Sequence, residues 1–109
     1  MTHLIALHDN VSDEQFQVIE QLFNHNLDML KEDNKMTEYN HVCNILGKVL
    51  DLDVIDKDEL QVIIDFAQQE HYMFVENFVD EDFNDFYHDS IKSSFLLLRK
   101  LLVLKDSMK

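Results

Sequence analysis

The fold class is decided by residues 56–78, which read DKDELQVIIDFAQQEHYMFVENF. Asp56 followed by Glu59 is the pattern of a capping box, in which each side chain accepts a hydrogen bond from the other residue's backbone amide. Apolar residues then recur at three- and four-residue spacing, at Leu60, Ile63, Ile64, Ala67, Phe74 and Phe78, with Phe66 and Met73 beside them. This periodicity predicts one long amphipathic helix over about 57–78.

Similar patterns predict three further helices, at about 13–33, 37–50 and 81–106. Ser12 and Gln15 match a second capping box before the first of them. The polar run at 88–90 predicts a break in the last one, with a short helix at 81–88 before it. Because only short connections join the helices, we expect an all-α fold, an up-down antiparallel four-helix bundle.

The length of 109 residues predicts a single helical domain over 1–109, with residues 1–11 as an extended or flexible N-terminal segment. Gly47 interrupts the helix at 37–50 and costs it about 1 kcal/mol relative to alanine, which predicts a close helix contact there. Cys43 lies on the apolar stripe of the same helix, which is typical of a buried small hydrophobic residue.

The chain has a net charge of −13, which argues against direct binding to nucleic acid or to an anionic membrane surface. Residues 1–91 carry 21 acidic and 4 basic side chains, and residues 92–109 carry one acidic and five basic side chains. No apolar run approaches the roughly 20 residues of a membrane span, and the N-terminus lacks a basic region before its short apolar run. We therefore expect a cytoplasmic protein.

Two acidic clusters are candidate partner-binding sites. The first follows the second predicted helix and contains Asp51, Asp53, Asp56, Asp58 and Glu59. The second precedes the last long helix and contains Asp80, Glu81, Asp82, Asp85 and Asp89, with Phe83, Phe86 and Tyr87 as aromatic anchors. The alternative interpretation is that these carboxylates are solvated and cap helix ends.

Charge and composition favour a non-enzymatic module that binds a protein with a basic surface. The composition is similar to that of small acidic inhibitors from phages and mobile elements, so the favoured form is a DNA-mimic-like inhibitor or decoy of a basic nucleic-acid-handling protein. The alternative is an immunity protein, antitoxin or secretion chaperone that binds through the apolar C-terminal helix. There Leu96 and Val103 would form a second interface, in a homodimer or with a partner helix.

Catalytic and cofactor chemistry finds little support. A single glycine excludes nucleophile elbows and phosphate-cradling loops, so we expect no enzyme and no cofactor. The acids after Asp51 lack the glycine and glutamate of an EF-hand loop. A di-iron bundle remains an alternative, because Glu38-x-x-His41 and Asp85-x-x-His88 approach the Glu-x-x-His ligand spacing. His88 also resembles the surface histidine of phosphotransfer bundles, although Lys92 lies four residues after it and not three.

Overall fold

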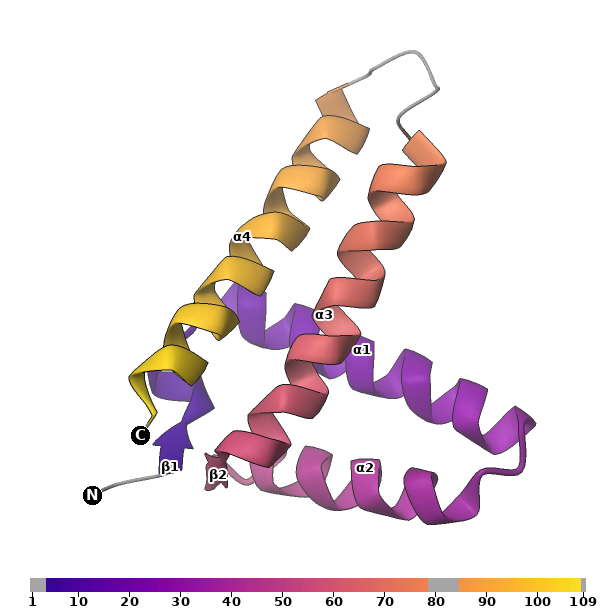
Figure 1. Ribbon diagram of the computed structural model, residues 1–109, viewed down its shortest axis with the longest axis vertical. Helices are drawn as coiled ribbons and strands as arrows, with labels where there is room; N and C mark the ends of the chain where they lie inside the picture. The colour runs from indigo at the N-terminus through magenta and orange to yellow at the C-terminus, as the bar shows by residue number, and fades with distance from the viewer. Residues whose placement is uncertain (1–3, 79–84, 109) are drawn as a thin grey trace.

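The computed structural model confirms an all-α bundle of four helices (Figure 1). It describes residues 4–78 and 85–108; of residues 77, 78, 85–88 and 90 it describes the backbone only. The helices are α1 (Asp13–Glu32), α2 (Met36–Leu50), α3 (Lys57–Phe78) and α4 (Asp85–Ser107). The first three agree with the predicted ranges to within one residue at each end.

The predicted break near 88–90 is wrong, because α4 continues from Asp85 to Ser107 without interruption. Polar residues such as Asp89 lower helix propensity by less than about 1 kcal/mol each, and the chain has neither proline nor a glycine in this segment. Packing of α4 along α3 outweighs so small a penalty. Residues 81–84, which the prediction also placed in this helix, lie outside the described residues.

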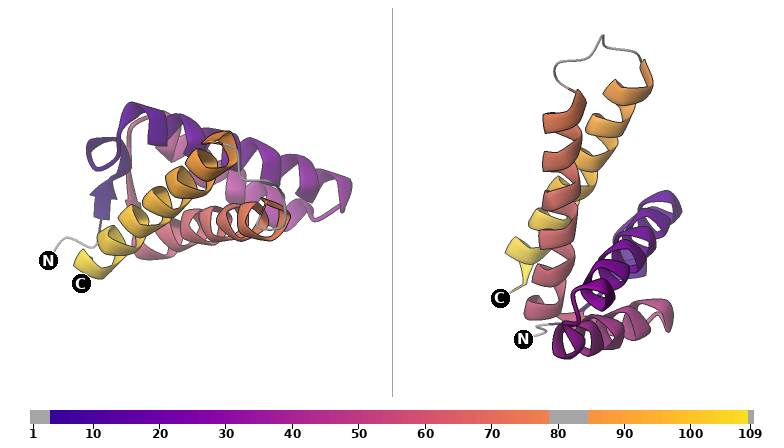
Figure 2. Two further views of the ribbon diagram at one scale, coloured as in Figure 1. Left: turned by 90° about the horizontal axis from the view of Figure 1, so that it is seen from above. Right: turned by 90° about the vertical axis from the view of Figure 1, so that its right-hand side faces the viewer.

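The helices form two antiparallel hairpins that cross each other. Figure 1 shows the α1–α2 hairpin lying across the lower part of the α3–α4 hairpin. The right-hand view of Figure 2 shows α1 inclined away from α3, so that the two hairpins diverge like the arms of a V. The far end of the α3–α4 hairpin therefore extends beyond α1 and α2.

Two short strands join the N-terminal segment to the link between the hairpins. β1 (Leu4–Ala6) pairs antiparallel with β2 (Val54–Asp56), with Ile5 opposite Ile55. A 3-10 turn at Leu7–Asp9 follows β1 and buries Leu7 in the core. Within the N-terminal segment, Leu4–Ala6 is extended and is held by its partner strand.

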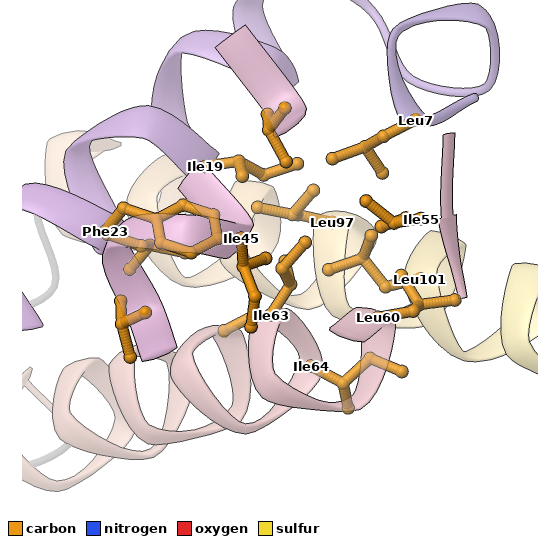
Figure 3. Packing of buried hydrophobic residues seen from close by; sticks show 14 of the residues in the cluster. Leu7, Ile19, Phe23, Ile45, Ile55, Leu60, Ile63, Ile64, Leu97 and Leu101 are labelled. Atoms are coloured by element: carbon orange, nitrogen blue, oxygen red, sulfur yellow. The ribbon is translucent and has the colours of Figure 1, made fainter. Parts of the chain in front are cut away.

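The hydrophobic core lies where the two hairpins and the β ladder meet (Figure 3). The rings of Phe23 on α1 and Phe66 on α3 meet edge to face, with their centroids 5.6 Å apart. Cys43 is half-buried and packs against this core, as its place on the apolar stripe predicts. The fully buried core residues come from all four helices, the 3-10 turn and β2: Leu7, Ile19, Phe23, Ile45, Val49, Ile55, Leu60, Ile63, Ile64 and Leu101.

Both predicted capping boxes are present. The Ser12 hydroxyl accepts from the Gln15 amide at 3.1 Å, and the Gln15 side chain accepts from the Ser12 amide at 3.0 Å. On α3, Asp56 accepts from the Glu59 amide at 2.8 Å, and Glu59 accepts from the Asp56 amide at 3.0 Å. These four bonds fix where the two core-forming helices begin.

Helices α1 and α2 each end on a residue in the left-handed conformation, Asn34 (φ 57°) and Leu52 (φ 58°). This conformation closes the last helical turn and is favoured by glycine or asparagine, whereas leucine adopts it at a steric cost. The close contact predicted at Gly47 is wrong, since a Cβ built there would meet nothing within 4 Å. Gly47 faces solvent and only weakens α2.

Candidate functional site

The first acidic cluster is largely part of the local structure. Asp53 accepts a hydrogen bond from the amide of Val54 at 2.8 Å, and Asp56 and Glu59 form the capping box of α3. The second carboxylate oxygen of Glu59 lies 2.9 Å from the Lys48 ammonium on α2. Asp51 and Asp58 are the most open members of this cluster, because both are exposed and have no hydrogen bond or ion pair among the described side chains.

The second acidic cluster falls mainly outside the described side chains. Residues 80–83 are not described, and Asp85, Phe86 and Tyr87 are described only as backbone of the first turn of α4. Asp89 is exposed and faces a hollow beside α1. α4, which carries Asp89, begins beside the C-terminal end of α3, whereas the first cluster lies at the N-terminal end of α3 (Figure 1). Asp89 and the first cluster are therefore at opposite ends of that helix.

A cleft lies between α1 and the α3–α4 hairpin, which we call the α1–α3 cleft. It consists of two hollows, of about 490 and 500 Å³, that share Glu70 and Phe74 as a common wall. The first hollow lies between the start of α1 and α4, where Glu14, Val18, Asp89 and Leu96 line it. The second continues along α1 toward its C-terminal end and is lined by Leu22, His25, Met29, Phe66 and Met73.

Glu70 is the ionisable group at the centre of this cleft. Burial raises the pKa of its carboxyl, and His25 on α1 partly offsets this effect. The described residues that line the two hollows include no lysine or arginine, while Glu14, Glu70 and Asp89 contribute three carboxylates. The cleft is thus apolar along its floor and negatively charged.

His71, next in sequence to Glu70, points to a different neighbour. Its Nδ1 lies 2.8 Å from the hydroxyl of Ser94 on α4, and that hydroxyl donates to the carbonyl of Ile91 at 2.9 Å. A hydroxyl that donates to this carbonyl can still accept a hydrogen bond from Nδ1 of His71. The ring of His71 also lies 5.6 Å from that of Phe95. This arrangement links α3 to α4.

The solvent-facing side of α4 carries a second distinctive surface. Leu96 and Val103, the residues predicted to form a second interface, are 46% and 59% exposed, and Leu96 stands at the edge that this surface shares with the first hollow of the cleft. Phe95 and Leu102 are exposed beside them, and the basic side chains on this side are those of Lys92, Arg99 and Lys100. We call this surface the α4 outer face. The interface itself remains a prediction.

The candidate metal ligands are not brought together by the fold. Glu38 and His41 are exposed near the start of α2, whereas Asp85 and His88 belong to the start of α4, at a different end of the molecule (Figures 1 and 2). Among the described side chains, no three histidine, cysteine or acidic residues are grouped closely enough to hold a metal ion. The side chain of His88, the phosphotransfer candidate, lies outside the described residues.

The sequence could have indicated the cleft through one irregularity. Positions 70 and 71 lie in register with the apolar stripe of α3, between Ala67 and Phe74, yet they carry Glu70 and His71. Polar residues on a helical face that is otherwise apolar mark a place where that face is not covered by the core.

Comparisons with protein-family models, curated proteins and solved structures gave no match for this chain. No helix in the described parts of the chain has the length and apolar character needed to cross a membrane. Function must therefore be argued from the charge, the cleft and the α4 outer face alone.

Proposed function

We propose that the protein is a non-enzymatic binding module whose acidic surface recognises a protein with a basic surface. The observation that carries the proposal is that most of its carboxylates are exposed without a basic partner. Within the described residues, Lys48–Glu59 is the single ion pair that joins a carboxylate to a lysine or arginine. Exposed carboxylates lie along the helices and loops, at Asp13, Glu14, Asp28, Glu32, Asp33, Glu38, Asp51, Asp58, Asp65, Glu76 and Asp89.

Such an uncompensated field favours association with a positively charged surface. It increases the rate of encounter and the selectivity for a partner more than it increases the affinity. Duplex DNA presents about one negative charge per 1.7 Å of its axis, so a protein that binds DNA has a basic surface able to accept carboxylates instead. The form that we favour is an inhibitor or decoy that occupies the DNA-binding surface of such a protein.

The test is capture of partners from the native host lysate on immobilised protein, followed by elution with a salt gradient and mass spectrometry. We expect a basic nucleic-acid-handling protein to elute at a few hundred millimolar salt, because ionic screening shortens the range of surface electrostatics. The complex of the two purified proteins should then dissociate when duplex DNA is added in excess. A captured partner that resists salt, or no captured partner, would contradict the proposal.

A second candidate function rests on the α4 outer face. Large apolar side chains exposed together on one helix are typical of a protein interface, and Phe95, Leu96, Leu102 and Val103 are all more than 40% exposed. This favours the alternative of an immunity protein, antitoxin or secretion chaperone that uses the C-terminal helix. Val103→Glu would abolish a salt-resistant complex formed through this face, whereas it would leave a complex formed through the carboxylates intact.

A further inference from the structure

The α1–α3 cleft has the shape of a docking groove for one helix. Its lining residues on α1 run from Ser12 to Met29, a distance of about 26 Å along the helix. The opposite wall is formed by α3 from Phe66 to Phe74 and by the adjoining part of α4. The groove is accessible to solvent, because Glu14, Met29 and Met73 in its lining are exposed.

The floor of the groove is apolar, and flexible methionine side chains line its open edge. Val18, Leu22 and Phe66 lie along the floor, so an entering segment would bury apolar side chains there. Met29 and Met73 stand on opposite sides, 49% and 53% exposed. Methionine side chains are flexible and polarisable, and they are common on surfaces that accommodate a partner helix.

The charge of the groove limits what can occupy it. Glu14, Glu70 and Asp89 line it, and its described lining contains no lysine or arginine. Glu70 is half-buried, so its carboxylate has lost part of its hydration without gaining a basic partner beyond His25. A lysine or arginine brought in by another molecule would replace that lost hydration with a charge-assisted hydrogen bond.

We propose that the α1–α3 cleft binds a basic amphipathic helix of the partner, with its apolar face on Val18, Leu22 and Phe66 and a basic side chain at Glu70. The inference rests on the proposed function, since it locates where the basic partner docks. Helix-in-groove recognition of this kind uses apolar anchors at i, i+3, i+4 and i+7. Basic side chains between those anchors then meet the carboxylates of the groove.

The first experiment titrates the isotope-labelled protein with the model peptide LKKLLKLLKKLLKL and follows the backbone amides by NMR. We expect shifts concentrated on α1 between Ser12 and Met29 and on α3 between Phe66 and Phe74. The acidic peptide LEELLELLEELLEL should cause none. Shifts spread over the exposed carboxylates of the whole chain would overturn the proposal, because they would show attraction to net charge without a groove.

The second experiment compares matched variants by calorimetry with the same basic peptide. Glu70→Gln should weaken binding about fivefold to tenfold more than Glu32→Gln, which removes an equally charged, exposed group that does not line the cleft. Met73→Ser should likewise weaken binding relative to Met36→Ser, where the methionine is 50% exposed outside the cleft. Because both methionines are exposed, neither serine variant is expected to unfold.

Equal effects within each matched pair would overturn the groove as the docking site, while the salt-eluted partner of the lysate experiment would still support the proposed function. Conversely, if no basic partner is captured from the lysate, the proposed function is contradicted, whether or not the model peptide binds in the groove. A second copy is the other occupant to test, because the α4 outer face also combines basic and apolar side chains. Analytical ultracentrifugation would test this. A dimer that dissociates when the peptide is added, and that Glu70→Gln weakens, would mean that the α4 outer face of a second copy occupies the groove in place of a partner helix.

Discussion

Lys48 and Glu59 tie the end of α2 to the start of α3 across the link that contains β2. One oxygen of the Glu59 carboxylate lies 2.9 Å from the Lys48 ammonium, and the other accepts the backbone amide of Asp56 at 3.0 Å. A single carboxylate thereby connects the two helix hairpins and also caps α3. It belongs to a cluster whose members were candidates for partner binding, and its position shows that local structure already uses it.

Glu59→Ala should lower the free energy of unfolding by about 1–2 kcal/mol, because it removes both a capping bond and an ion pair. Lys48→Ala should lower it by less, since it removes only a partly exposed ion pair and leaves the capping bond in place. Urea denaturation followed by circular dichroism measures both. Equal losses for the two variants would mean that the ion pair, and not the cap, carries the stabilisation.

Gly47→Ala should raise the free energy of unfolding by about 1 kcal/mol, the difference in helix propensity between the two residues. The added methyl group meets no atom within 4 Å, so no steric cost offsets the gain. Thermal denaturation is sufficient to measure it. A loss of stability would show that a partner surface or a tighter packing, not seen in this structure, requires the glycine.

Leu52→Gly should also stabilise the protein, by about 1 kcal/mol, although glycine normally weakens a chain through its flexibility. Leu52 has φ 58° and is 56% exposed, so it adopts the left-handed conformation with little packing in return. The matched control is Leu50→Gly at the last residue of α2, where the backbone is helical and glycine should destabilise the protein. If both variants destabilise, packing of the Leu52 side chain outweighs its backbone strain.

The stability of the protein should depend on Glu70 through pH. Burial raises the pKa of its carboxyl in the folded state, so the ionised form is less favourable there than in the unfolded chain. The resulting destabilisation is absent below the ordinary carboxyl pKa and fully present above the raised folded pKa. The groups around Glu70 are His25, which opposes the shift, and the carboxylates of Glu14 and Asp89 in the same cleft.

We therefore expect Glu70→Gln to be more stable than the parent protein at pH 7, with a difference that shrinks as the pH falls through the carboxyl range. Chemical denaturation at a series of pH values measures this difference. The control is Glu32→Gln, which removes an exposed carboxylate that does not line the cleft. A difference for Glu70→Gln that does not change with pH would contradict the assignment of the effect to ionisation.

The helices could be predicted because their signals are local. Both capping boxes and the apolar stripe of α3 lie within a few residues of the structure that they specify, and they appear as predicted. The pairing of Ile5 with Ile55 could not be predicted in the same way, because fifty residues separate the two strands. The break expected near Asp89 failed because packing outweighs weak local preferences.

The candidate site was less accessible to sequence reasoning for the same reason. The cleft arises from the angle at which the two hairpins cross, which depends on how side chains from different hairpins, such as the buried Phe23 and the partly buried Phe66, pack edge to face. The acidic residues were easy to see but their roles were not. Asp56 and Glu59 stabilise a helix start, whereas Glu70, which belongs to no run of acids, occupies the centre of the cleft.

The β ladder has a consequence for the order in which the chain folds. Each helix hairpin joins elements that are neighbours in sequence, whereas β1 and β2 must close a loop of about fifty residues before their hydrogen bonds form. Formation of the hairpins should therefore precede closure of the ladder, and Leu7 should be buried last. Separation of β1 from β2 should likewise be the first step of unfolding. Hydrogen exchange at the Ile5 amide should therefore be faster than exchange in the helices of either hairpin.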